Sequence, residues 1–107
     1  MTNPAAEDYP RVPAGDGVTR QVLADDPALM LVEFTFASGA VGALHQHPHV
    51  QSTFVRSGEF EFTVGGRTHR LRAGDSLMIP SDVEHGCRAL EAGSLIDGFA
   101  PRRDDFL

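Results

Sequence analysis

Three of the five histidines in this 107-residue chain stand close together, at His45, His47 and His49. Side chains two positions apart project from the same face of an extended segment, so the imidazoles of His45 and His47 could bind one cation together. This spacing alone is weak evidence for a metal, because paired histidines also occur at exposed and structural positions. His49 is expected to lie outside the ligand set. Pairing it with His47 would place Thr53, a poor ligand, at the offset where Gln51 follows His47.

A longer frame surrounds these histidines. It reads Gly39, five residues, His45 and His47 with one residue between them, three residues, Gln51, six residues and Gly58. A second frame reads Gly74, five residues, Pro80 and, five positions on, His85. Together they resemble the two motifs of the cupin superfamily, G-x5-H-x-H-x3,4-E-x6-G and G-x5-P-x-G-x2-H-x3-N. The chain departs from these motifs at Gln51, where the family usually has Glu, and at Asp82 and Ala89, which replace Gly and Asn.

The resemblance is closest to the small cupin family typified by the pectin degradation protein KdgF. It is carried over most of residues 28–107 by the segments HQHPHVQ (45–51), SGEFEFTVGG (57–66), AGDSLMIPSDVEHG (73–86), RALEAGS (88–94) and LIDGFAPRRDDFL (95–107). The resemblance implies an isomerase or tautomerase that linearises 4,5-unsaturated monouronates released by pectin and alginate lyases. The metal ligands it implies are His45, His47, Gln51 and His85, and the other site residues are Asp97, Phe99 and Arg103.

The residues themselves support part of this assignment. Asp97 and Phe99 share one face of an extended strand, whereas Ile96 faces the other way. A carboxylate directed into a barrel is costly unless it is partnered or functional. The opposite facing, with Ile96 inside and Asp97 in water, is equally compatible with the alternation. Arg102 and Arg103 are adjacent in the tail, so either of them could be the site arginine.

The implied site suggests a division of roles. Asp97 would be the acid and base, Arg103 would hold the substrate carboxylate with its planar fork, and Phe99 would pack against the sugar ring. Neutral ligands would leave a divalent ion its full charge, and they suit zinc, nickel, iron, manganese or cobalt. Two other functions fit the same ligands: a cupin-type metal-dependent dioxygenase, and a non-enzymatic cupin that binds a metal and a small ligand. Fold analogy alone does not choose among them.

The elements around these residues predict an all-β protein. Alternating patterns between Gly and Pro turns predict strands over 18–23, 29–37, 51–56, 59–64, 67–71, 76–79, 87–90 and 94–100, and a helical turn near 102–106. Gly65 and Gly66 are expected to close a β-hairpin between the strands over 59–64 and 67–71. Phe34, Phe36, Phe60 and Phe62 are expected in the core. The chain is thus expected to be a single-domain cupin, a double-stranded β-helix or jelly-roll barrel over residues 18–107 with a short C-terminal tail, after an N-terminal arm over residues 1–17.

Composition limits the partners. The chain has 15 acidic residues against 9 basic ones, all of them arginine, and a formal charge of -6, which argues against nucleic acid and anionic membranes. An anionic monosaccharide needs only a locally positive cavity.

Cys87 is the only cysteine, so no internal disulfide can form. Its side chain is expected to be a small buried hydrophobe, whereas His69 is expected on the surface. No secretory signal or membrane span is visible, so a cytoplasmic protein is expected. The resemblance also implies a homodimer, for which an exposed edge strand would supply the motive.

Overall fold

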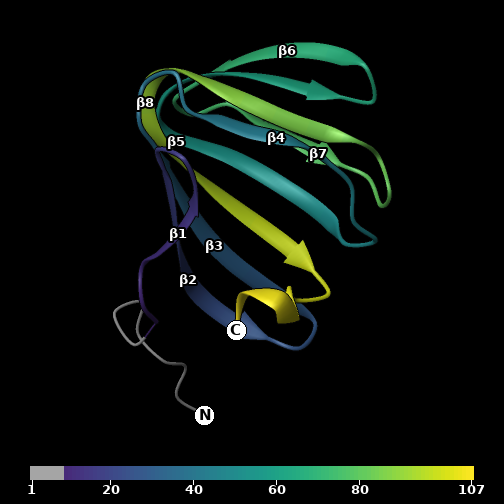
Figure 1. Ribbon diagram of the computed structural model, residues 1–107. Coiled ribbons are helices and arrows are strands. Elements are labelled where there is room, and N and C mark those ends of the chain that lie inside the picture. Colours follow the sequence, from purple (N-terminus) through teal and green to yellow (C-terminus); the bar gives the residue numbers. More distant parts are fainter. Residues whose placement is uncertain (1–8) are drawn as a thin grey trace.

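The structure is a computed structural model that describes residues 9–107 (Figure 1). Its strands are β1 (Val12–Gly15), β2 (Val18–Asp26), β3 (Leu29–Phe36), β4 (Val41–His45), β5 (Val50–Val64), β6 (Arg67–Arg72), β7 (Ser76–Ile79) and β8 (His85–Ala100). One short 3-10 helix, η2 (Asp104–Phe106), lies in the C-terminal tail, where a helical turn is predicted. Within the described residues there is no helix with the length and hydropathy that a membrane span requires.

The eight strands form one antiparallel sheet in the order β1-β2-β3-β8-β5-β6, to which β4 is added beside β8 and β7 beside β5. The two longest strands, β5 and β8, run side by side through the middle of the sheet and pair along most of their length. Both bend, so the sheet curls around an interior, as Figure 1 shows. This arrangement confirms the predicted all-β barrel.

The long strands differ from the prediction, which divides each of them in two. The expected turn at Glu91–Gly93 is instead a bend within β8, and the break near Gly58 is a bend within β5. The β5–β8 register shifts around Ser57 and Glu59, which is the signature of bulges. Gly58 has φ 81° and an added Cβ would lie 2.6 Å from the Ala92 carbonyl oxygen, so the bend requires glycine here. Turn-forming residues are absorbed into the strands because strand pairing continues through the bend.

The N-terminal region also differs in part from the arm that is expected over residues 1–17. Residues 12–15 form β1, which pairs with β2 at the edge of the sheet. Residues 1–8 of the predicted arm lie outside the described residues. The hairpin prediction is confirmed. Val64 pairs with Arg67 across Gly65 and Gly66, whose φ values of 56° and 80° are both positive, as a type I′ turn requires.

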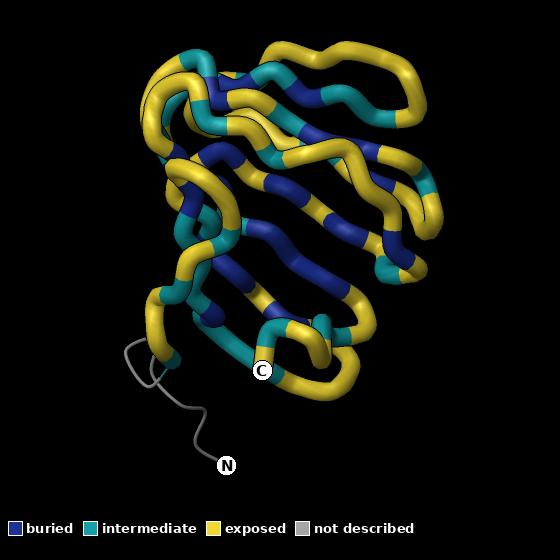
Figure 2. The backbone as a smooth tube through the Cα atoms, in the orientation of Figure 1, coloured by how far each residue is buried: buried dark blue, intermediate teal, exposed yellow. Residues whose placement is uncertain are grey.

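The core consists of two clusters of inward-facing side chains. One cluster includes Phe36, Phe60 and Phe62, with Phe34 packed against it, so the predicted aromatic core is confirmed. The second cluster contains Val22, Met30, Val32 and Phe99, with Phe34 and Phe106 packed against it. Figure 2 shows buried residues alternating with more exposed ones along several strands, as expected for a barrel whose strands bury one face.

Candidate metal centre and active-site cavity

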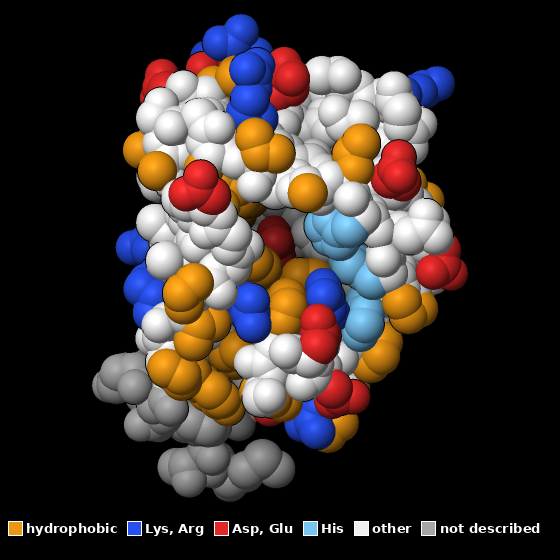
Figure 3. Space-filling view, in the orientation of Figure 1, with side chains coloured by type: hydrophobic (Ala, Val, Ile, Leu, Met, Phe, Trp, Pro, Cys, Tyr) orange, Lys and Arg blue, Asp and Glu red, His pale blue; other side chains and the backbone are white. Residues whose placement is uncertain are grey.

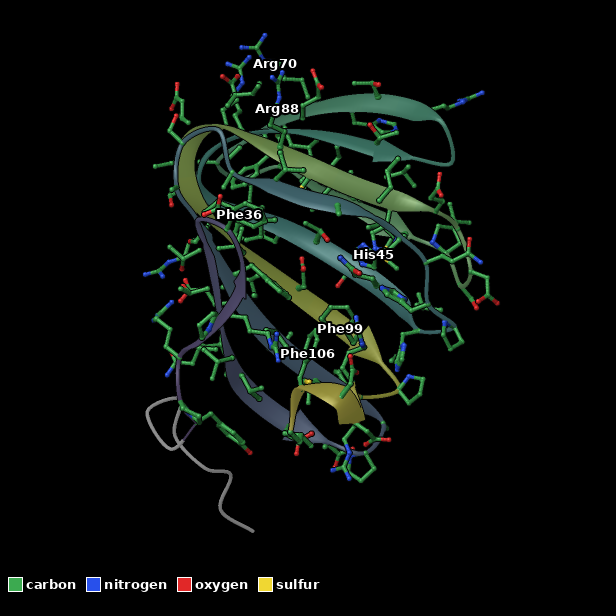
Figure 4. The ribbon with its side chains drawn as sticks, in the orientation of Figure 1. Phe36, His45, Arg70, Arg88, Phe99 and Phe106 are labelled. Carbon is green, nitrogen blue, oxygen red and sulfur yellow. The ribbon has the colours of Figure 1, made fainter. Side chains whose placement is uncertain are left out.

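His45 and His47, which are two positions apart, meet His85, which is distant in sequence, at one end of the barrel. His45 is the last residue of β4, His85 is the first residue of β8, and the two are register partners. His47 lies in the loop between β4 and β5. One ring nitrogen from each of the three histidines can be chosen so that all three atoms lie within 4.8 Å of one another. The predicted histidine cluster is therefore assembled by the fold, and Figure 4 shows His45 directed toward the interior of the barrel.

The backbone orients all three rings in the same way. The Nδ1 atoms of His45, His47 and His85 lie 2.7, 3.0 and 2.9 Å from the carbonyl oxygens of residues 43, 49 and 83. An Nδ1–H that donates to a carbonyl leaves the Nε2 lone pair free to bind a metal. The Nε2 of His85 is buried and has no hydrogen-bond partner among the residues that the structure describes. Burial also lowers the pKa of both His47 and His85, which keeps these imidazoles neutral and able to act as ligands.

Gln51 on β5 completes the cluster. Its Oε1 lies 3.0 Å from His47 Nε2, and its Nε2 donates to the Thr53 hydroxyl at 3.0 Å. The bond to Thr53 turns the amide so that its oxygen points at the histidine. In neutral His47 with a proton on Nδ1, two lone pairs would then face one another. A cation between them resolves this conflict, so the donor set fits a bound metal ion.

A departure from the second cupin motif can be explained at Asp82. Its φ of 62° lies in the left-handed region, which explains why the motif has glycine there. Aspartate is among the few other residues that adopt this conformation readily. The Asp82 amide donates to the His47 carbonyl oxygen at 2.8 Å, so this turn holds the loop that carries a ligand.

The histidines border a cavity of about 320 Å³ inside the barrel. Asp97, Phe99 and Arg103 line it together with His45, Gln51 and His85. Figure 3 shows the opening, with histidines on one side, cationic side chains along the rim and an acidic side chain deep inside. The structure therefore brings together all seven predicted site residues. His47 belongs to this group through its contacts with Gln51 and His85.

Of the two facings compatible with the alternation in β8, the structure has Asp97 inside. It is 5% exposed and lies opposite Thr53 in the sheet, and its buried Oδ1 has no hydrogen-bond partner within residues 9–107. Burial raises the pKa of Asp97 to about 7, although its hydrogen bond with Thr53 and the charge of Arg103 act in the opposite direction. A carboxyl group with a pKa near neutrality can both release and accept a proton.

The tail distinguishes between the two adjacent arginines. Arg103 lines the cavity, with its central carbon 5.1 Å from the ring centroid of Phe99 and 4.3 Å from that of Phe106. Its Nε and one terminal nitrogen bind the Asp105 carboxylate at 3.0 and 2.8 Å. Arg102 instead forms ion pairs with Asp25 and Asp104 and does not line the cavity.

The remaining singled-out residues lie largely where the sequence predicts. His69 is exposed on β6, and His49 contributes its carbonyl oxygen to His47. Cys87 is partly buried and borders the cavity, where burial raises the pKa of its thiol to about 12, so it is not a thiolate near neutral pH.

Phe106 and Arg20 are among the cavity-lining residues that lie outside the predicted site. Phe106 of η2 packs edge-to-face against Phe99, with ring centroids 5.7 Å apart, and Figure 4 shows the two rings adjacent. Arg20 of β2 also lines the cavity. A signal for Arg20 exists in the sequence, because it alternates with Val18 and Val22 and therefore shares their inward face.

Comparison with known proteins agrees with this geometry. A family model described as "Cupin domain" matches residues 32–96. The pectin degradation protein KdgF of Dickeya dadantii (strain 3937) is 42% identical over 95 residues, which cover 87% of this chain and 86% of that protein. A solved structure of an RmlC-like cupin from Shewanella frigidimarina NCIMB 400 has a TM-score of 0.91 and 38% identity, covering 100% of both chains. The structure of KdgF from Halomonas sp. has a TM-score of 0.90 and 38% identity, covering 100% of this chain and 99% of that one.

Proposed function

The chain belongs to the cupin family, and we propose that it linearises 4,5-unsaturated monouronates by ring opening and ketonisation. The family match and the similarity to KdgF over most of the chain confirm the resemblance found in the sequence. The observation that carries the proposed chemistry is the buried Asp97 carboxyl in the same cavity as the three-histidine cluster. A buried carboxyl close to residues that could hold a cation supports a reaction that moves a proton and stabilises negative charge.

His45, His47, Gln51 and His85 would hold one divalent transition metal, such as zinc, nickel, iron, manganese or cobalt. A metal held by these neutral ligands keeps its full positive charge and supplies Lewis-acid stabilisation of negative charge that develops on oxygen. The carbonyl groups that bind the three Nδ1 atoms keep the rings oriented for this role.

Asp97 would move the proton that the reaction requires. As a carboxylate, it accepts the proton of the anomeric hydroxyl, the C1–O5 bond breaks, and C1 becomes an aldehyde. The released O5 is then the oxygen of an enolate that includes C4 and C5. Asp97 returns the proton to C4 while the C5–O5 bond becomes a ketone. The proton taken equals the proton returned, so the reaction is an isomerisation without redox change, and Asp97 ends ready for the next turnover.

Phe99 and Arg103 would position the sugar. The ring of Phe99 packs against an apolar face and keeps water from the reacting carbons. Arg103 would contact the substrate carboxylate through the part of its guanidinium that Asp105 does not occupy. Because Phe106 lies under the same guanidinium, η2 holds Arg103 against the cavity.

The test is an anaerobic assay with an unsaturated monouronate, followed by the loss of absorbance of the C4–C5 double bond, with and without a chelator. Wild-type protein should consume the substrate without oxygen, and chelation should stop the reaction. Asp97→Ala should retain its metal and its fold but lose most of the activity. A nearly normal rate in this variant would remove Asp97 from the mechanism. Oxygen consumption that is required for turnover would instead support the dioxygenase alternative.

We also propose that the chain acts in the cytoplasm as a homodimer on uronates from pectin or alginate breakdown. The dimer is consistent with exposed apolar side chains on the outer face of the sheet, among them Phe54 on β5 and Met78 on β7, which are 45% and 61% exposed. Sedimentation equilibrium tests this proposal. Wild-type protein should sediment at twice the chain mass, and a mass equal to one chain would contradict it.

A further inference from the structure

Arg20 is a charged residue on the inward-facing side of β2, where the alternation of the strand predicts an apolar core residue. Its neighbours on the same face of β2, Val18 and Val22, are each only 4% exposed. The guanidinium lies over the ring of Phe106, with its central carbon 4.3 Å from the centroid, and lines the cavity that contains Asp97 and the histidines. An arginine directed inward among apolar side chains is costly unless a partner compensates for the lost hydration.

No such partner is found among the described residues. Within residues 9–107 the Nε of Arg20 is buried without a hydrogen-bond acceptor, and the guanidinium forms no ion pair with a carboxylate. In the part of the chain that the structure describes, the guanidinium has a close electrostatic contact with the ring of Phe106 beneath it. Stacking on a ring leaves the planar edge of the guanidinium free, and this edge is the part that binds carboxylates through two parallel hydrogen bonds.

Arg103, the second arginine of the cavity, differs from Arg20 because its guanidinium is paired with a carboxylate. Arg103 already uses its Nε and one terminal nitrogen to bind Asp105. Its charge is therefore largely compensated within the protein, and one fork of its guanidinium is occupied. The central carbons of Arg20 and Arg103 each lie 4.3 Å from the centroid of the Phe106 ring, so the two residues occupy the same end of the cavity.

We propose that Arg20 is an anion-binding residue of this cavity and that its free guanidinium receives the carboxylate of the uronate. The identity of this ligand rests on the proposed function. In this arrangement Arg20 binds the uronate carboxylate through two hydrogen bonds. Arg103, which is held by Asp105, contacts the same carboxylate only through the part of its guanidinium that remains free. Arg20 also borders a smaller pocket of about 260 Å³ with Tyr9 and Leu107, but that pocket contains none of the histidines. The larger cavity is where a substrate can contact the guanidinium and the metal centre together.

The test compares Arg20→Gln and Arg20→Lys with a matched control. Arg67→Gln removes the same charge from an exposed position on β6 that does not line the cavity. For the unsaturated monouronate, Arg20→Gln should raise KM by about 10- to 100-fold, which corresponds to the loss of a charge-assisted contact. Its kcat should change by less than about 3-fold, because the carboxylate is bound equally in ground and transition states. Arg20→Lys should be intermediate, and Arg67→Gln should match wild type.

A merely structural role makes different predictions. Loss of a structural arginine would lower the unfolding temperature and leave KM unchanged. Under our proposal Arg20→Gln unfolds at or above the wild-type temperature, because it removes a half-buried charge that has no ion-pair partner among the described residues, and it retains the wild-type metal content. An unchanged KM in Arg20→Gln would overturn the proposal even if the enzyme linearises the substrate normally.

A binding experiment separates this proposal from the proposed function. Titration calorimetry with D-galacturonate, a saturated monouronate, and with uncharged D-galactose measures carboxylate binding without turnover. Wild-type protein should prefer galacturonate, and Arg20→Gln should lose that preference while Arg67→Gln retains it. If this pattern holds but no unsaturated uronate is consumed, Arg20 is still the anion-binding residue and the proposed reaction is wrong. Equal preference in wild type and Arg20→Gln would overturn the role of Arg20.

Discussion

Replacing Asp97 with asparagine should change the way in which the stability of the metal-free protein depends on pH. Burial raises the pKa of Asp97 to about 7 in the folded chain, against a usual value of 3.8. Below pH 3.8 the carboxyl is neutral in both states and its full contribution to stability is present. As the pH rises, the unfolded chain ionises first, so stability falls until the folded carboxyl also ionises near pH 7. Above that pH the slope from this group disappears.

The size of the effect follows from the two pKa values. Their difference corresponds to a loss of about 4 kcal/mol in the free energy of unfolding over the whole range, of which about 3 kcal/mol falls between pH 5 and pH 8. Asparagine cannot ionise, so Asp97→Asn should lack this loss. His47 and His85 act with the opposite sign, because burial lowers their pKa values and stability is lost as the pH falls. Wild-type protein and Asp97→Asn both retain these histidines, so the effect of the histidines on stability cancels when the two proteins are compared.

The assay is urea unfolding in the presence of a chelator at several pH values from 5 to 8. The chelator is needed because a bound cation would also favour the ionised carboxyl. Relative to wild type, Asp97→Asn should gain about 3 kcal/mol of stability between pH 5 and pH 8. Glu91→Gln, which removes an exposed acid, should remain parallel to wild type. Parallel curves for wild type and Asp97→Asn would refute the reasoning, because they would mean that Asp97 is not a buried group with a raised pKa.

Three further predictions concern the surroundings of the site. His85→Ala should weaken metal binding by at least about 10-fold in a zinc titration, whereas the exposed His69→Ala should bind as wild type does; retained affinity would show that the ligand set is wrong. Thr53→Val removes a hydroxyl that lowers the pKa of Asp97, so a carboxyl NMR titration of the metal-free protein should place that pKa above the wild-type value. An unchanged value would contradict the Thr53 contact. Asp82→Ala should cost about 1 kcal/mol in thermal unfolding because of its positive φ, and Asp82→Gly should not destabilise; equal losses would argue against backbone strain.

Much of the fold follows from local pattern. Alternation over residues 29–37 and 59–64 predicts inward-facing aromatic side chains correctly, because a pleated strand buries one face. The adjacent Gly65 and Gly66 predict the hairpin for an equally local reason. The strand boundaries in β5 and β8 are wrong in the prediction, since residues that form turns in isolation can also form a bulge when a neighbouring strand pairs across them.

The chemical types in the site follow from sequence, but their orientations do not. The ligand set and the proton-transfer group are predictions. They come from the spacing of His45 and His47, from the resemblance that adds Gln51 and His85, and from the alternation of Asp97 with Phe99. Periodicity alone left the facing of β8 open, because shifting a strand by one residue exchanges its two faces. Pairing of β8 between β3 and β5 decides it in the structure.

The tail shows the same division between sequence and tertiary structure. The amino-acid pattern is enough to predict a small acidic all-β chain with the histidines, glutamine and carboxylate of a cupin-type site. Three features of the site come from the folded structure. Arg103 lines the cavity and Arg102 does not, Asp105 already occupies part of Arg103, and Arg20 enters the same cavity from β2 without a carboxylate partner among the described residues. The physical reason is that hydration and charge compensation depend on which groups meet across the barrel, and a linear pattern does not contain these distances.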